Sequence, residues 1–278
     1  MSFKTILGVI GIDHDNADAI AIARFADRAQ AHLNGAVVAS VPPPPFGEVV
    51  GNAYEIWSQM WEDESNRLDR RVGELRQLLK DKGLPGDLQP VYSIQGDVAG
   101  EIGERARYAD VTMVGGDMLK DESLLKRVLD GAIFDSPTPT ILVPKGREID
   151  TAPKRILVAW NAGVEAGQAL RQSMELLAGA EDVRVVVVDP QATSYAMGQE
   201  PGADIAAFLA RHGVKTTVDV LASGDHQVDE VLRQHAVDIN ADLIVMGAYG
   251  HSRLRERIFG GTTNSMIKNP TVPVLFAH

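Results

Sequence analysis

Four glycines near the end of the chain have the spacing and setting of a phosphate-binding loop. Gly247 follows the apolar run DLIVM at 242–246, Gly250 comes three residues later, and a basic stretch then leads to Gly260 and Gly261. Glycine lets a chain turn with φ > 0 or approach a ligand closely, and it allows backbone N–H groups to point at phosphate oxygens. A phosphate loop and a turn that binds nothing are both consistent with this pattern.

The residues around these glycines add to the attraction for an anion. TNSMIKN at 263–269 predicts a short helix, so a phosphate beside Gly260 and Gly261 would meet a helix N-terminus and its partial positive charge. Arg253 adds charge attraction without specific geometry. His251 could contact a phosphate or serve as an acid–base group, or it could simply be solvated.

The chain also repeats itself, since four segments recur in the same order in each half. The repeat predicts two homologous domains, 1–146 and 152–278, joined by the polar linker GREIDTAP. The matched pairs are KTILGVIG at 4–11 with KRILVAWN at 154–161, QGDVAGEI at 95–102 with SGDHQVDEV at 223–231, ADVTMVGG at 109–116 with ADLIVMGA at 241–248, and PTPTILVP at 137–144 with PTVPVLFA at 270–277.

Each half alternates short apolar runs with segments of helical periodicity. VRVVVVDP at 183–190 is rich in valine and typical of a parallel strand that is buried on both faces. EAGQALRQSMELLAG at 165–179 predicts one helix that ends at Gly179. Strand–helix alternation of this kind predicts an α/β fold: two tandem open parallel five-stranded sheets, each with helices on both faces.

The tandem α/β repeat and the spacing Gly247-x2-Gly250-x9-Gly260 resemble the universal stress protein family, whose nucleotide-binding members carry G-x2-G-x9-G followed by Ser or Thr. The resemblance covers essentially the whole chain and implies a fold that binds adenine nucleotides such as ATP. It also implies that the residue at the end of the first strand of the domain, here Asn161, faces the nucleoside. The second strand, here ending at Val188, would supply backbone contacts to adenine.

The sequence departs from the family pattern in two places. Gly261 stands where the family has Ser or Thr, although Thr262 follows, and Asn161 stands where it usually has Asp. An asparagine still donates and accepts hydrogen bonds. Two interpretations therefore stay open: ATP or a related adenine nucleotide bound by the second domain, or a structural turn without a ligand.

The first domain is expected not to bind ATP. Gly115 keeps the first glycine of the motif, but Met118 stands near the second and Asp130 stands in place of the third. Its other carboxylates would repel phosphate, and we interpret them as solvated surface charges rather than a metal site: Asp117, Asp121 and Glu122. A long helix at about 53–82 carries Trp57 and Trp61, which could form a partner surface or pack on the sheet.

Composition narrows the remaining classes of function. The net charge of -11 argues against nonspecific binding of nucleic acid, and the absence of cysteine excludes disulfides and thiolate metal sites. No apolar run reaches the roughly 18 residues of a membrane span, so we expect a cytoplasmic protein. Neither a P-loop nor a G-x-S-x-G elbow is present.

Two kinds of function remain possible for this sequence. The first is a non-enzymatic stress or signalling protein whose second domain binds an adenine nucleotide, with weak ATPase activity as a lesser variant. The second is a nucleotide-independent protein of the same fold that binds a protein partner or a small apolar ligand. In both, the apolar last strands of the two halves are expected to pair, giving a pseudo-dimeric chain that could itself form a homodimer.

Overall fold

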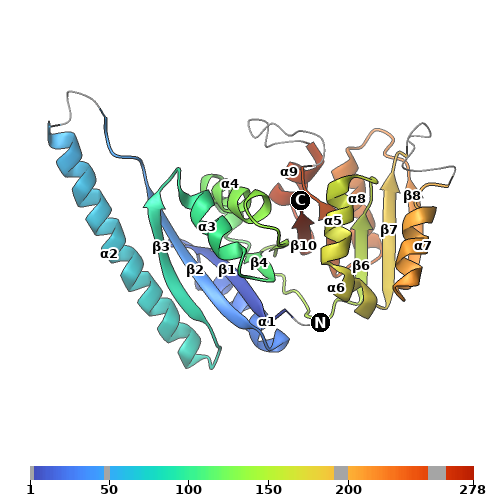
Figure 1. Ribbon diagram of the computed structural model, residues 1–278, viewed down its shortest axis with the longest axis horizontal. Helices are drawn as coiled ribbons and strands as arrows, with labels where there is room; N and C mark the ends of the chain where they lie inside the picture. The colour runs from blue at the N-terminus through green and yellow to red at the C-terminus, as the bar shows by residue number, and fades with distance from the viewer. Residues whose placement is uncertain (1–2, 47–50, 191–199, 250–260) are drawn as a thin grey trace. The chain divides into compact units, whose positions relative to one another are not determined.

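The computed structural model describes residues 3–46, 51–190, 200–249 and 261–278. Its contacts divide the chain into two compact units, Ser2–Thr138 and Pro139–His278. Figure 1 shows that each unit has a sheet with helices packed on it. Among the described helices, none combines the length and the apolar character needed to cross a bilayer.

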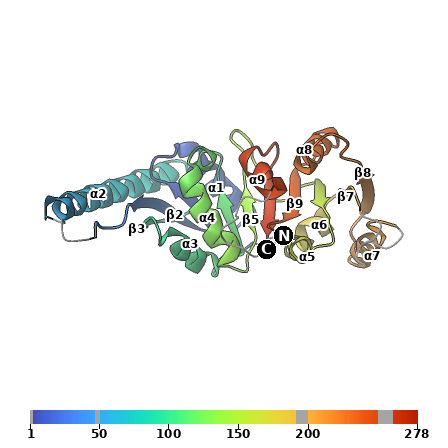
Figure 2. The same cartoon turned by 90° about the horizontal axis from the view of Figure 1, so that it is seen from above.

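The first unit contains a parallel sheet with the strand order β3-β2-β1-β4. Right-handed crossovers place α1 and α2 on one face and α3 on the other, as Figure 2 shows. Its elements are β1 (Thr5–Gly11), α1 (Asn16–Ala29), β2 (His32–Val41), α2 (Gly51–Asp81), β3 (Asp87–Ile94), α3 (Val98–Ala106), β4 (Val111–Val114), the 3₁₀ turn η1 (Met118–Lys120), α4 (Glu122–Leu129) and the π turn η2 (Asp130–Phe134).

The second unit has five parallel strands in the order β8-β7-β6-β9-β10, and β5 pairs antiparallel with β10, placing Ile141 opposite Leu275. Helices α5, α6 and α7 cover one face, and α8 and α9 cover the other (Figure 2). Its elements are β5 (Thr140–Leu142), β6 (Arg155–Ala159), α5 (Val164–Gln172), α6 (Met174–Gly179), β7 (Asp182–Val188), α7 (Ala203–Arg211), β8 (Thr216–Leu221), α8 (Val228–Asp238), β9 (Leu243–Gly247), α9 (Gly261–Lys268) and β10 (Val274–Ala277).

This architecture confirms the predicted α/β class with parallel sheets. The central strands are buried on both faces: Ile156, Leu157, Leu243 and Ile244 have no exposed side-chain surface. Continuous burial explains why these strands read as unbroken apolar runs instead of alternating patterns. In the part of the chain that the structure describes, the first unit has four strands and not the predicted five, because the contacts group β5 with the second unit.

The predicted helix at 165–179 is two helices. The hydroxyl of Ser173 is buried and donates to the carbonyls of Ala169 and Leu170 at 2.8 and 3.2 Å. A serine that bonds back to the preceding turn competes with the backbone ladder and bends the helix, so α5 ends at Gln172 and α6 begins at Met174. Gly179 does not have the positive φ of a glycine that ends a helix.

The long helix α2 is present over Gly51–Asp81, and its two tryptophans pack within the unit. The ring of Trp61 lies 4.3 Å from that of Tyr92 on β3, and the Trp57 ring lies 5.3 Å from Trp61. The indole N–H of Trp57 donates to the carbonyl of Pro42 at 2.9 Å. The aromatic row therefore fixes α2 on β3 and on the proline-rich segment that follows β2.

Candidate functional site

A cavity of about 540 Å³ lies in the second unit at the carboxyl ends of β6, β7 and β9. Strand order reverses here, since β6 has β7 on one side and β9 on the other. Open parallel sheets bind ligands at this position, where loops diverge beyond the strand ends. The cavity is lined by Ala159, Trp160, Asn161, Glu165, Ala166, Val186, Val188, Val228, Leu232, Met246, Gly247, Tyr249, Gly261, Thr262 and Thr263.

One end of the cavity is apolar. Val186 and Val188 come from β7, and Val228 and Leu232 come from α8 one helical turn apart. Met246 of β9 adds a flexible side chain that is nearly buried. A flat apolar group such as a nucleobase could be accommodated against these side chains.

The other end is the beginning of α9. Gly261 and Thr262 are the first two residues of this helix, and the hydroxyl of Thr263 accepts the backbone N–H of Tyr249 at 3.3 Å. The N-terminus of a helix presents backbone N–H groups and a partial positive charge, which favour an anion. Gly261 does not have positive φ, and a Cβ added there would meet nothing within 4 Å.

The turn between β6 and α5 positions Asn161 at the cavity. Its Oδ1 accepts the backbone N–H of Gly163 at 2.9 Å, and Ala162 between them has φ 58°. An Asx turn of this kind explains how a residue other than glycine is held in the left-handed region. The turn fixes the amide of Asn161 at the mouth of the cavity.

Gly247 is required by packing, whatever the cavity binds. A Cβ at this position would stand 2.5 Å from the backbone nitrogen of Ala166 and 2.5 Å from the carbonyl carbon of Glu165. The end of β9 and the first turn of α5 therefore touch backbone to backbone. The sequence predicts a ligand-binding role for Gly247, which stays a prediction, and the structure adds a role in the packing of α5 on the sheet.

The predicted site residues converge as far as the structure describes them. Asn161, Val188, Gly247, Gly261 and Thr262 come from four separate segments and line one cavity. The other four, Gly250, His251, Arg253 and Gly260, lie outside the described residues. The cavity is also lined by residues that the sequence did not predict, among them Trp160, Glu165, Val186, Val228, Leu232, Met246, Tyr249 and Thr263. Three of them had a local signal, since Trp160, Met246 and Thr263 are direct neighbours in sequence of predicted site residues.

The same position in the first unit is filled by the unit's own side chains. The carboxylate of Asp18 accepts the backbone N–H of Asp117 at 2.9 Å, and Asp117 in turn accepts the N–H of Asp15 at 3.0 Å. A Cβ on Gly115 would stand 2.2 Å from Asp18. Asp117 is 4% exposed, so its interpretation as a solvated surface charge was wrong. It is a buried acceptor that also pairs with Lys120 at 2.8 Å.

His14 occupies the space beyond β1 in the first unit. Its Nδ1 accepts the N–H of Gly11 at 2.9 Å, and a Cβ on Gly11 would stand 2.6 Å from the ring. Burial lowers the pKa of His14, and the nearby carboxylates of Asp121 and Asp117 offset this shift only in part. The neutral tautomer with its proton on Nε2 is therefore favoured in the folded protein.

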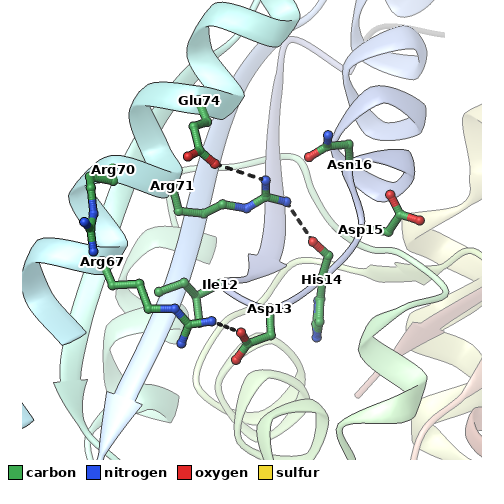
Figure 3. A pocket seen from close by; sticks show the side chains of 9 residues that line it. All are labelled: Ile12, Asp13, His14, Asp15, Asn16, Arg67, Arg70, Arg71 and Glu74. Carbon is green, nitrogen blue, oxygen red and sulfur yellow. Dashed lines mark hydrogen bonds and ion pairs between the residues drawn. The ribbon is translucent and has the colours of Figure 1, made fainter. Parts of the chain in front are cut away.

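A second cleft of about 600 Å³ separates the β1–α1 loop from α2 (Figure 3). Arg67 forms an ion pair with Asp13, and Arg71 donates to the carbonyl of His14 at 2.7 Å while lying 3.8 Å from Glu74. Arg67 and Arg71 thus tie the loop to α2. The cleft is lined by Ile12, Asp13, His14, Asp15, Asn16, Arg67, Arg70, Arg71 and Glu74.

Comparison with known proteins shows similarity to one family. The model of the universal stress protein family matches residues 153–278. A universal stress protein of Synechocystis is 26% identical over 222 residues, and the match covers 76% of this chain but only 65% of that protein's length. Residues 153–278 are therefore similar to the universal stress protein family.

Solved structures agree on the fold of the whole chain. A universal stress protein from Archaeoglobus fulgidus superposes with a TM-score of 0.61 at 16% identity, covering 98% of this chain and 95% of that one. A putative universal stress protein from Pseudomonas aeruginosa gives a TM-score of 0.60 at 15% identity, covering 99% and 93%. Both are chains of similar length, so the likeness extends over both units.

Proposed function

We propose that the second unit binds an adenine nucleotide, with ATP as the ligand to test first, and that the protein acts as a non-enzymatic stress or signalling protein. The observation that carries this proposal is the convergence of Asn161, Val188, Gly247, Gly261 and Thr262 on one cavity at the switch in strand order. The glycine motif and the residues after it supply Gly247, Gly261 and Thr262, and the family resemblance of the strand ends supplies Asn161 and Val188.

The two ends of the cavity suit the two parts of a nucleotide, its phosphates and its base. Phosphates would lie at the start of α9, where a Cβ added at Gly261 would meet nothing within 4 Å. The base would lie against Val188 and Leu232 at the apolar end. Burial of a base on such side chains is favourable by about 25 cal/mol for each Å² of apolar surface, while the N-terminal N–H groups orient the phosphates.

The first unit is proposed not to bind nucleotide. Its equivalent position holds the hydrogen bonds between Asp18 and Asp117, and carboxylates there would repel phosphate. One nucleotide per chain is therefore the expected stoichiometry.

The decisive experiment places a charge at the phosphate end. Thr262→Glu adds a carboxylate in the first turn of α9, where the helix dipole favours it, so the variant should fold as well as the wild type. Its charge should repel the phosphates and weaken ATP binding at least tenfold, measured by isothermal titration of the full chain. Thr217→Glu, on the exposed part of β8, is the matched control and should bind as the wild type does.

A nucleotide-independent protein of the same fold is the second candidate, and the apolar end of the cavity is the observation that favours it. In that case the purified chain would show no heat with ATP and no nucleotide in its acid extract. It would still bind a small apolar dye, and Leu232→Glu would abolish that binding. Protein partners, a homodimer and a cytoplasmic location stay predictions from the sequence.

A further inference from the structure

Exposed apolar side chains gather at the beginning of α2. In the part of the chain that the structure describes, eight large apolar side chains are exposed, and four of them fall within residues 46–60: Phe46, Tyr54, Ile56 and Met60. The other four are scattered over both units. Single exposed apolar residues are normal on a protein surface, whereas a local group of them marks a contact surface.

Packing within the first unit does not cover this group. The fully buried apolar side chains of α2 all lie in its second half: Leu68, Val72, Leu75 and Leu79. In the first half, Trp57 and Trp61 contact their own unit. Ile56 and Met60 each directly precede one of these tryptophans, so their side chains point about 100° away from it around the helix. Figure 1 shows the beginning of α2 projecting past the end of β3.

The charges of α2 indicate how two copies of this helix would pair. Asp63 follows Met60 by three residues and continues the same face. Up to residue 66 the helix contains no lysine or arginine, and its first turn contains no acidic residue. A parallel pair in register would place Asp63 beside Asp63, and like charges repel. In an antiparallel pair with Ile56 opposite Met60, Asp63 falls opposite residue 53, beside a helix N-terminus whose partial positive charge favours an acid.

We propose that the chain forms a symmetric dimer in which the first half of α2 packs antiparallel on the same helix of a second copy. The two-fold axis is level with residue 58, and the contact is self-complementary, because Ile56 of each copy meets Met60 of the other. Residues 51–65 of the two helices then overlap over about 22 Å. This contact is smaller than the standard interface of about 800 Å² per partner, so the dimer should dissociate on dilution.

Sedimentation equilibrium of the full chain without nucleotide measures the dissociation constant of this dimer. Ile56→Glu places two carboxylates in the apolar contact and should raise the constant at least tenfold, while glutamate preserves the exposed helix. Val164→Glu is the charge-matched control, since Val164 is an exposed apolar residue at the start of α5, and it should leave the constant unchanged. A wild-type chain that is monomeric at about 1 mM, or an Ile56→Glu variant that dimerises as the wild type does, overturns the proposal.

The orientation of the two helices has a test of its own, because the chain contains no cysteine. Ile56→Cys and Met60→Cys are mixed in equal amounts under mild oxidation. The mixed disulfide dimer should form several-fold faster than a disulfide between identical variants, since the antiparallel pair brings residue 56 of one copy beside residue 60 of the other. Disulfides mainly between identical variants, or none at all, would overturn the antiparallel contact.

Discussion

The hydroxyl of Ser265 on α9 donates to the carboxylate of Asp229 on α8 over 2.5 Å. Arg233, one turn further along α8, reaches the same carboxylate at 2.8 Å. Asp229 is 5% exposed. This bond between two helices fixes the position of the beginning of α9, and therefore of Gly261 and Thr262, relative to the apolar side chains of α8.

Replacing the shared acceptor should loosen the site and the fold together. Asp229→Ala leaves the guanidinium of Arg233 without its buried partner, and breaking a buried pair in this way costs roughly 3 kcal/mol. Urea unfolding should show that loss, and ATP affinity should fall because the first turn of α9 is no longer held. Asp238→Ala removes an exposed carboxylate at the end of the same helix and should change the free energy of unfolding by less than about 0.5 kcal/mol. Equal effects of the two changes would contradict a positioning role for Asp229.

The class of fold could be predicted because the strands are buried on both faces and stand out as apolar runs between helical segments. The break at Ser173 could not, since it depends on whether a hydroxyl bonds back to its own helix or to solvent. The glycine spacing and the strand ends identified residues of the cavity. Val228 and Leu232 were not identified, because α8 has several apolar positions and only packing decides which of them face the cavity. The packing role of Gly247 could not be predicted for a related reason, because the sequence does not show that α5 lies against the end of β9.

Gly247→Ala should destabilise the protein even in the absence of any nucleotide. The added methyl would stand 2.5 Å from backbone atoms at the start of α5, so the helix must shift. Overpacking of this kind costs roughly 1–3 kcal/mol, measurable by thermal and urea unfolding.

The control for Gly247→Ala is Gly167→Ala within α5, where a Cβ meets nothing within 4 Å. That change should raise stability by about 0.5–1 kcal/mol, because alanine favours a helix. If Gly247→Ala proved neutral in stability yet abolished ATP binding, the glycine would serve the ligand and not the packing.

The stability of the protein should fall as the pH drops below neutrality, and His14 should account for part of the fall. Burial lowers the pKa of His14 from its ordinary value of 6.5, so the unfolded chain takes up this proton before the folded protein does. The contribution of His14 is therefore present above pH 6.5 and is lost progressively as the pH falls through 6.5 towards the lowered folded-state pKa. Protonation also removes the acceptor for the N–H of Gly11.

His14→Gln supplies an amide oxygen as a substitute acceptor that does not titrate. Urea unfolding at pH 7.5 and pH 5.5 should show a smaller difference between the two conditions for this variant than for the wild type. The same difference in both proteins would mean that His14 titrates as it does in the unfolded chain.

Gly261→Ser tests whether the beginning of α9 binds phosphate. Gly261 does not have positive φ, a Cβ there meets nothing within 4 Å, and serine is well suited to the start of a helix. The variant should fold at least as stably as the wild type. If a phosphate lies at this helix terminus, the new hydroxyl should add a hydrogen bond of about 1 kcal/mol and tighten ATP binding roughly three- to tenfold.

Gly224→Ser is the matched control, because Gly224 has φ 59° and lies outside the cavity. Serine there should cost about 1 kcal/mol of stability and leave ATP affinity unchanged. Thermal melts and ATP titration of both variants separate the outcomes: a stable Gly261→Ser protein with unchanged affinity would show that the glycine only begins a helix.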